Sequence, residues 1–357
     1  MFDLGSLRKL PCQTALFFQV SLILIIAAIA LMTPAQENLQ LPKEPIYPGQ
    51  APEEVSVAVF EARDMVIQRR YAEAERILWK FTRSHPDSPV GPTGLMVVYQ
   101  VRMLENEEFF LDDEMRRVIE LNRTALLKFR KVAPKNAWYF TLIGASLGIE
   151  GIYHLWRDDY VPAGLRGYAA IQNMGKALEA DKLNWEARMG LGLYTYYRSV
   201  YALKVPFLPA SVDRREEGIA EVKLAGEKRV YLDETARIAL CRIYFDGHRY
   251  DESKKAADGL IKDYPSFLVS YLFAAKACFG AGKFAEAIPY YEKACQIDPS
   301  LTFAPYRLGV CFQNIGNKDM AAKWFKIAIE AGKKRNGDKW GTEARVQLRA
   351  LHPGKNR

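Results

Sequence analysis

The strongest constraint on this chain is a repeat of about 34 residues that runs from residue 234 to residue 335. The last two copies place a small residue, then an aromatic residue four positions later, then another small residue after three more. Two successive copies show this spacing: Ala287, Tyr291 and Ala294, followed by Ala321, Phe325 and Ala328. Residues spaced in this way lie on one face of a helix. The small residues let a second helix approach closely, and the aromatic ring fills the remaining gap.

Prolines and glycines keep the same phase. Pro265 and Pro299 are one repeat length apart, as are Gly282 and Gly316. Proline cannot continue the helix that it follows, so each proline predicts a boundary between two helices.

These residues resemble the tetratricopeptide repeat, a 34-residue helix-turn-helix unit. Residues 282–299 follow that pattern closely, whereas Tyr271 stands where the family often has Trp and Cys278 where it often has an aromatic residue. The resemblance implies an α-solenoid, and solenoids of this family usually bind other proteins or peptides. In such a solenoid each repeat contacts only its neighbours.

Extending the phase predicts an all-α, right-handed solenoid of about seven helical hairpins: 55–88, 89–136, 137–184, 185–233, 234–267, 268–301 and 302–335. Three of these units are about 48 residues long, which adds roughly two turns to each helix. The remaining signature positions are Ala74, Pro86, Gly144, Gly192 and Gly309. We interpret residues 336–357 as a capping helix followed by a basic tail.

An apolar run from Thr14 to Met32 precedes the repeats and follows Arg8 and Lys9. Its length is close to the thickness of a bilayer's hydrocarbon core, so residues 1–35 are either an uncleaved signal anchor or a cleaved signal peptide. The basic flank predicts that the rest of the chain lies outside the cytoplasm. The leading peptide to Ala35 favours a bacterial periplasm or cell envelope, and an anchored eukaryotic protein is the alternative. Residues 36–54 hold four prolines and are expected to form an extended linker.

The net charge of +8 is concentrated at the C-terminal end, where eight Lys and Arg face two acidic residues from Lys333 onward. We interpret this tail as a solvated end of the last repeat and expect no nucleic-acid partner. Four histidines and the absence of any CxxC pair leave little material for metal or acid–base chemistry. We therefore expect no cofactor, no metal ion and no catalytic residue.

The first helices of successive repeats line the concave surface in this family, and positions one repeat length apart form rows along it. Rows of cations and aromatic side chains favour an extended peptide with an acidic group. The predicted groove residues are Tyr196, Arg242, Phe245, Leu272, Lys276, Phe279 and Tyr306. A protein or peptide is the predicted partner, with the membrane contacted through the N-terminal segment.

Two predicted hairpin turns carry clusters of polar side chains. The acidic cluster from Glu105 to Glu114 lacks the spacing of a calcium loop, and we expect it to lie in solvent. His154 and Asp158 lie one helical turn apart and leave open a second hypothesis, an envelope enzyme or metal-binding protein. A third hypothesis is an architectural element that self-associates through its hairpin turns.

Overall fold

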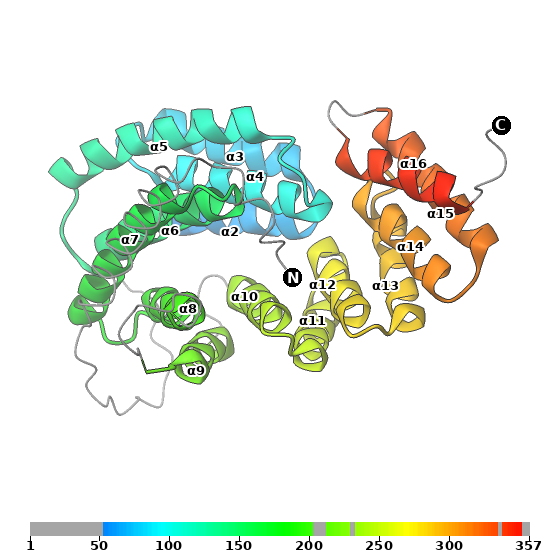
Figure 1. Ribbon diagram of the computed structural model, residues 1–357. Helices are drawn as coiled ribbons and strands as arrows, with labels where there is room; N and C mark the ends of the chain where they lie inside the picture. The colour runs from blue at the N-terminus through cyan, green and yellow to red at the C-terminus, as the bar shows by residue number, and fades with distance from the viewer. Residues whose placement is uncertain (1–52, 203–211, 229–232, 335–337, 352–357) are drawn as a thin grey trace, which may run out of the picture. The chain divides into compact units, whose positions relative to one another are not determined.

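The computed structural model describes residues 53–202, 212–228, 233–334 and 338–351. These residues form the helices α2 to α16 and contain no strand, which confirms the predicted all-α class of helical hairpins (Figure 1). The predicted apolar helix of residues 14–32 lies outside the described residues. Within the described ranges, no helix combines the length and the apolar character needed to cross a membrane.

The chain divides into two compact units. In the described part of the chain, one unit lies within residues 135–221. Its helices are α6 (Ala137–Trp156), α7 (Tyr160–Ala180), α8 (Trp185–Ala202) and the start of α9 (Arg215–Glu227). The first two are 20 and 21 residues long and carry the added turns that the enlarged spacing predicted, whereas α9 is 13 residues long and does not.

Small residues and a polar cap fix the packing within this unit. The side chain of Asn136 accepts a hydrogen bond from the backbone N–H of Tyr139 and so caps the first turn of α6. A Cβ atom at Gly144 would lie 2.9 Å from the sulfur of Met174, so glycine lets this side chain of α7 pack directly against α6. Asn184 Nδ2 donates to Thr141 Oγ1 over 2.7 Å and joins the start of α8 to α6.

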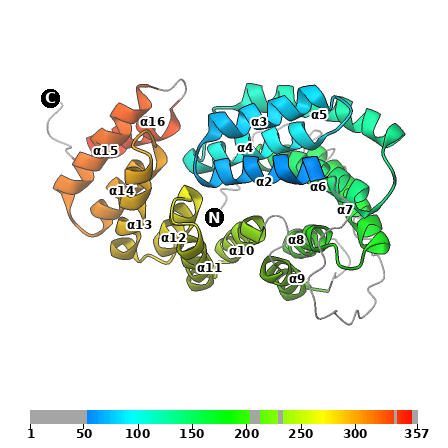
Figure 2. The same cartoon turned by 180° about the vertical axis from the view of Figure 1, so that it is seen from behind.

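The second unit comprises residues 50–134 and 222–357. Its N-terminal part contains α2 (Glu53–Ile67), α3 (Tyr71–Ser84), α4 (Val90–Asn106) and α5 (Asp112–Val132), which Figure 2 shows from behind. Its C-terminal part contains α10 (Asp233–Asp246), α11 (Tyr250–Asp263), α12 (Leu268–Gly280), α13 (Phe284–Ile297), α14 (Phe303–Asn314), α15 (Lys318–Gly332) and α16 (Lys339–Leu351). From α10 onward, each helix packs on the next helix of the chain.

The repeated residues form the interior of the C-terminal repeats. The small and aromatic positions of α13 and α15 are completely buried: Ala287, Tyr291, Ala294, Ala321, Phe325 and Ala328. Ala74 on α3 is completely buried as well, while Pro86, Pro265 and Pro299 lie exposed in the turns between hairpins. Gly144, Gly192 and Gly309 are buried within helices.

Gly282 and Gly316 have φ values of +74° and +82° in the turns inside their hairpins. His248, one repeat length before Gly282, has a φ of 58° at the equivalent place. A residue with a left-handed backbone conformation therefore recurs at this turn, and glycine adopts that conformation at the lowest cost in free energy.

One contact departs from the expectation that each hairpin touches only its neighbours. Helix α4 also packs against α12 and α14, the first helices of two C-terminal repeats. That expectation is therefore wrong for α4, which lies against repeats far along the sequence.

Candidate functional site

The C-terminal end of α4 and the turn that follows it lie on the surface formed by the first helices of the C-terminal repeats. Glu105, Asn106, Glu107 and Glu108 each take part in the contacts described below. Glu105 is only 2% exposed, and Asn106 is equally buried. The prediction of a solvated acidic turn is therefore wrong for these residues, because basic and amide groups from distant helices surround them. We call residues 105–108 the acidic turn.

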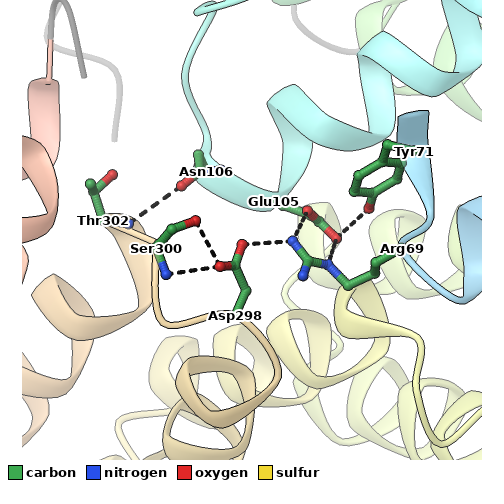
Figure 3. Close-up of polar contacts among 7 residues, drawn as sticks. All are labelled: Arg69, Tyr71, Glu105, Asn106, Asp298, Ser300 and Thr302. Carbon is green, nitrogen blue, oxygen red and sulfur yellow. Dashed lines mark hydrogen bonds and ion pairs between the residues drawn. The ribbon is translucent and has the colours of Figure 1, made fainter. Parts of the chain in front are cut away.

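Arg69 joins the acidic turn to the C-terminal repeats (Figure 3). Its Nε and Nη2 atoms donate to the two carboxylate oxygens of Glu105, each over 3.0 Å. Nη2 also donates to Oδ2 of Asp298 over 2.6 Å, and the hydroxyl of Tyr71 donates to Glu105 over the same distance. One guanidinium group therefore binds two carboxylates that come from opposite ends of the unit's sequence.

Burial and pairing pull the pKa values of these two carboxyl groups in opposite directions. Burial raises the pKa of Glu105, and its hydrogen bonds with Arg69 and Tyr71 only partly offset this effect. Burial also acts to raise the pKa of Asp298, but hydrogen bonds from Ser300 and the charge of Arg69 hold it below the ordinary value. Arg69 is thus the group that makes the burial of both carboxylates tolerable.

Asn106 binds the C-terminal repeats through both its side chain and its backbone. Its Oδ1 atom accepts from the backbone N–H of Thr302 over 3.4 Å (Figure 3). Its carbonyl oxygen accepts from Nε1 of Trp340, a buried ring on α16. These two bonds satisfy polar groups at the start of α14 and on α16 that would otherwise be buried without a partner.

Glu107 forms an ion pair with Lys276 of α12, although 169 positions separate them in sequence. The Lys276 ammonium also lies 5.3 Å from the ring centre of Phe245, within the range of a cation–π contact. Burial acts to raise the pKa of Glu107, but Lys276, with Arg307 and Arg242, lowers it below the ordinary value. Cations on α10, α12 and α14 therefore act together on one carboxylate.

An apolar contact lies behind these polar groups. Ile67 of α2 belongs to a buried cluster with Phe267 and Phe273, and Leu104 packs against the same cluster. Beside it, Arg63 forms an ion pair with Glu234 over 3.1 Å. The contact between the two parts of this unit thus has an apolar interior and a charged rim.

The predicted groove residues fall into three groups. Lys276 and Phe245 lie at the acidic turn, and Arg242 donates to Asp246 on its own helix over 2.8 Å. Phe279 is half-buried beside them, whereas Leu272 and Tyr306 are buried and offer little surface. Tyr196 belongs to the other unit, where it is buried, and a Cβ atom at Gly218 would lie 2.7 Å from its backbone nitrogen.

Arg307 is the residue at this surface that the sequence did not identify. It lies on α14, and its guanidinium is within 6 Å of the rings of Phe279, Phe303, Tyr306 and Trp340. The predicted rows join positions one repeat length apart, and the position equivalent to Lys276 in the next repeat is Val310. Arg307 lies one helical turn before Val310, so no predicted row contains it. The available signal was a cation within a run of aromatic and apolar residues from Phe303 to Phe312.

His154 lies between two carboxylates at the turn that joins α6 and α7. His154 Nε2 lies 3.8 Å from Glu150, and Nδ1 lies 3.5 Å from Asp159. Arg166 donates to the same Glu150 carboxylate over 2.8 Å and supplies it with a counter-ion. Within the described part of the chain, no cluster of three or more His, Cys, Asp or Glu residues is placed to hold a metal ion.

Paired helices that follow one another through the described residues place the chain among the all-α repeat proteins. Comparison with known families identifies the repeat: residues 238–301 match the tetratricopeptide repeat model, which confirms the resemblance that the sequence suggested. This stretch, from α10 to the turn before α14, consists of tetratricopeptide repeats. No curated protein matches the chain.

Several solved structures are similar to this chain. The MamA protein has 22% identity over 54% of this chain and 93% of its own, with a TM-score of 0.37. Yeast Tom70 has 14% identity over 98% of this chain and 75% of its own, with a TM-score of 0.43. A tetratricopeptide repeat protein from Parabacteroides merdae has 16% identity over 84% of this chain and 99% of its own, with a TM-score of 0.38.

Proposed function

We propose that this protein is a non-catalytic scaffold that binds a protein or peptide partner on the surface formed by α10, α12 and α14. We further propose that it works outside the cytoplasm, tethered to a membrane by its N-terminal segment. The apolar run from Thr14 to Met32 and the basic residues before it support this location.

The observation that carries the proposal is the contact between Lys276 and Glu107. A surface of cations and aromatic rings holds a carboxylate that comes from a segment 169 positions away. Charge-assisted hydrogen bonds and aromatic faces are the means by which interfaces recognise acidic segments. The surface therefore has the chemistry of a peptide-binding site.

Cross-linked membranes provide the test of partner binding. Alanine at Arg242 or Phe279 should reduce recovery of the cross-linked partner and leave the helical content, measured by circular dichroism, unchanged. Arg249→Ala is the matched control, because Arg249 also pairs with a nearby acidic residue, Glu252, but lies in the turn before α11. Equal recovery with all three variants would contradict the proposed function.

Fractionation tests the proposed location. The full chain should remain with the membrane pellet after a salt wash and should be digested by protease added to the extracytoplasmic side. Recovery in the soluble cytoplasmic fraction would contradict the location and leave partner binding to be judged by the variants.

A further inference from the structure

The acidic turn contacts the C-terminal repeats as a bound peptide would. Glu107 binds Lys276 of α12, Asn106 binds the start of α14 and Trp340 of α16, and Glu108 accepts from the backbone N–H of Lys339. Glu105 reaches Asp298 through Arg69. Four consecutive residues of the sequence Glu-Asn-Glu-Glu thus place their polar groups along the C-terminal repeats from α12 to α16.

The backbone of the acidic turn is set for this contact at some cost. Glu107 follows the last residue of α4 with a φ of 48°, in the left-handed region. Glycine is the residue that commonly ends a helix in this conformation, because a side chain there is unfavourable by roughly 1 kcal/mol. The glutamate at this position has a strained backbone, and its carboxylate forms the ion pair with Lys276.

Part of the recognition surface remains unused by the acidic turn. Among the described residues, Nε of Arg307 is buried without a hydrogen-bond partner. Four aromatic rings hold its guanidinium in place, and its charge acts on Glu107. An acidic segment that also bonded Arg307 would make a contact that the internal turn does not make.

Two polar contacts of the acidic turn, those of Glu107 and Glu108, are also within reach of solvent, whereas those of Glu105 and Asn106 are buried. The side chain of Glu107 is 27% exposed in its pair with Lys276, and Lys339 is exposed beside Glu108. Partly exposed charged pairs are screened by salt and add little net stability. A competing carboxylate can therefore replace Glu107 or Glu108 in these contacts. The apolar cluster around Phe267 can stay packed while this happens.

We infer that the acidic turn is an internal ligand, and that the partner of this surface carries an acidic peptide segment that replaces it. This assignment rests on the proposed function and specifies its partner and its regulation. The apparent affinity for the partner is the intrinsic affinity multiplied by the fraction of molecules in which the surface is open. A surface that the acidic turn occupies in most molecules therefore binds the partner weakly. The protein then binds its partner strongly only when the turn has been displaced.

The test uses the full chain and a fluorescent synthetic peptide with the sequence of residues 101–112, read by fluorescence anisotropy. Glu107→Gln removes the ion pair with Lys276 and should bind the peptide about threefold more tightly than the wild type does. Glu114→Gln is the matched control, since Glu114 pairs with Arg117 on its own helix and its substitution should leave affinity unchanged. A peptide with its three glutamates replaced by glutamine should not bind.

A second substitution places the peptide on the proposed surface. Lys276→Ala in the Glu107→Gln background should abolish the gain in affinity. If Glu107→Gln fails to fold, as judged by circular dichroism, Glu108→Gln serves in its place, because it weakens the contact of the same turn with Lys339. A gain in affinity that Lys276→Ala leaves intact would overturn the inference.

The remaining outcomes separate this inference from the proposed function. Equal, tight binding by wild type and Glu107→Gln would overturn the internal ligand but support an acidic partner. No binding by any variant would overturn the inference, whereas the proposed function is judged by the partner recovery of Arg242→Ala and Phe279→Ala. The Glu107→Gln chain could instead dimerise, as measured by light scattering, without gaining affinity for the peptide. That result would show that the surface binds a second copy of the chain, and it would also overturn the inference.

Discussion

Arg69 and Asp298 form a 2.6 Å charge-assisted hydrogen bond across 229 positions of sequence. The same guanidinium binds both oxygens of Glu105, so it links the first hairpin, the acidic turn and the C-terminal repeats (Figure 3). Arg69 has a φ of 60° and Glu107 a φ of 48°, so two residues of this contact adopt the left-handed region without being glycine. Strained residues of this kind persist where the surrounding structure holds them.

Removal of Arg69 should destabilise the unit far more than removal of its neighbour Arg70. Arg69→Met leaves Glu105 buried without a counter-ion, which should lower the free energy of unfolding by about 3 kcal/mol. Arg70 is exposed and pairs with Glu73 in the first turn of α3, so Arg70→Met should change stability little. Urea denaturation followed by circular dichroism measures both, and equal midpoints would contradict the role of Arg69.

The contribution of Asp298 should disappear in acid. Its pKa is lowered in the folded chain, so the unfolded chain takes up a proton at a higher pH than the folded chain does. The stability that Asp298 supplies is therefore present above its unfolded pKa of about 4 and lost as the pH falls through the folded value. Glu105 has the opposite effect on the pH dependence of stability. Its pKa is raised in the folded chain, so its contribution to the free energy of unfolding grows as the pH falls.

A variant isolates the contribution of Asp298 from that of Glu105. The difference in unfolding free energy between wild type and Asp298→Asn should be largest at neutral pH and shrink steadily below about pH 4. Chemical denaturation at a series of pH values measures it. A difference that stays constant down to about pH 2 would contradict the lowered pKa that Ser300 and Arg69 give Asp298.

The sequence pattern predicts the helices well because packing between neighbouring repeats is encoded locally. Ala287, Tyr291 and Ala294 identify the inner face of α13, since their spacing has only one helical solution. The acidic turn carries no such pattern. A run of glutamates looks the same in a sequence whether it faces water or lies against cations far along the chain.

One feature of the sequence does point to a distant contact. Lys276 lies among apolar residues on α12 and has no acidic residue one turn before or after it on that helix. A lysine on a buried face needs a counter-ion, and the missing acid has to come from another element. The pattern indicates that such an acid exists, but it cannot identify Glu107 among the acidic residues of the chain.

Gly309 should be intolerant of even one added methyl group. A Cβ atom there would lie 2.4 Å from the ring of Phe325, which is itself completely buried. Gly309→Ala should therefore cost about 1–3 kcal/mol through overpacking. Gly175→Ala is the control, because no atom lies within 4 Å of its added Cβ and alanine favours the helix by up to about 1 kcal/mol. Thermal unfolding distinguishes them, and a stabilised Gly309→Ala would contradict the close packing of α14 on α15.

Cys241 should resist alkylation while the chain is folded. It is completely buried, and burial raises the pKa of its thiol to about 12, so almost no thiolate is present at about pH 8. Cys241 shares a buried cluster with Ile67 of α2, so Arg69→Met should expose it more often. Iodoacetamide labelling followed by peptide mass spectrometry should show slow reaction in wild type and faster reaction in the variant. Rapid labelling of native Cys241 would contradict the cluster.

Zero-length carbodiimide cross-linking of the full chain tests most directly whether the acidic turn occupies the surface of α10, α12 and α14. The monomer should yield an amide between the Glu107 carboxylate and the Lys276 ammonium, identified by mass spectrometry of the digested band. Lys283 and Asp251, a 2.8 Å pair between neighbouring hairpins, serve as the internal control. Recovery of the control amide without any Glu107–Lys276 amide would contradict the account.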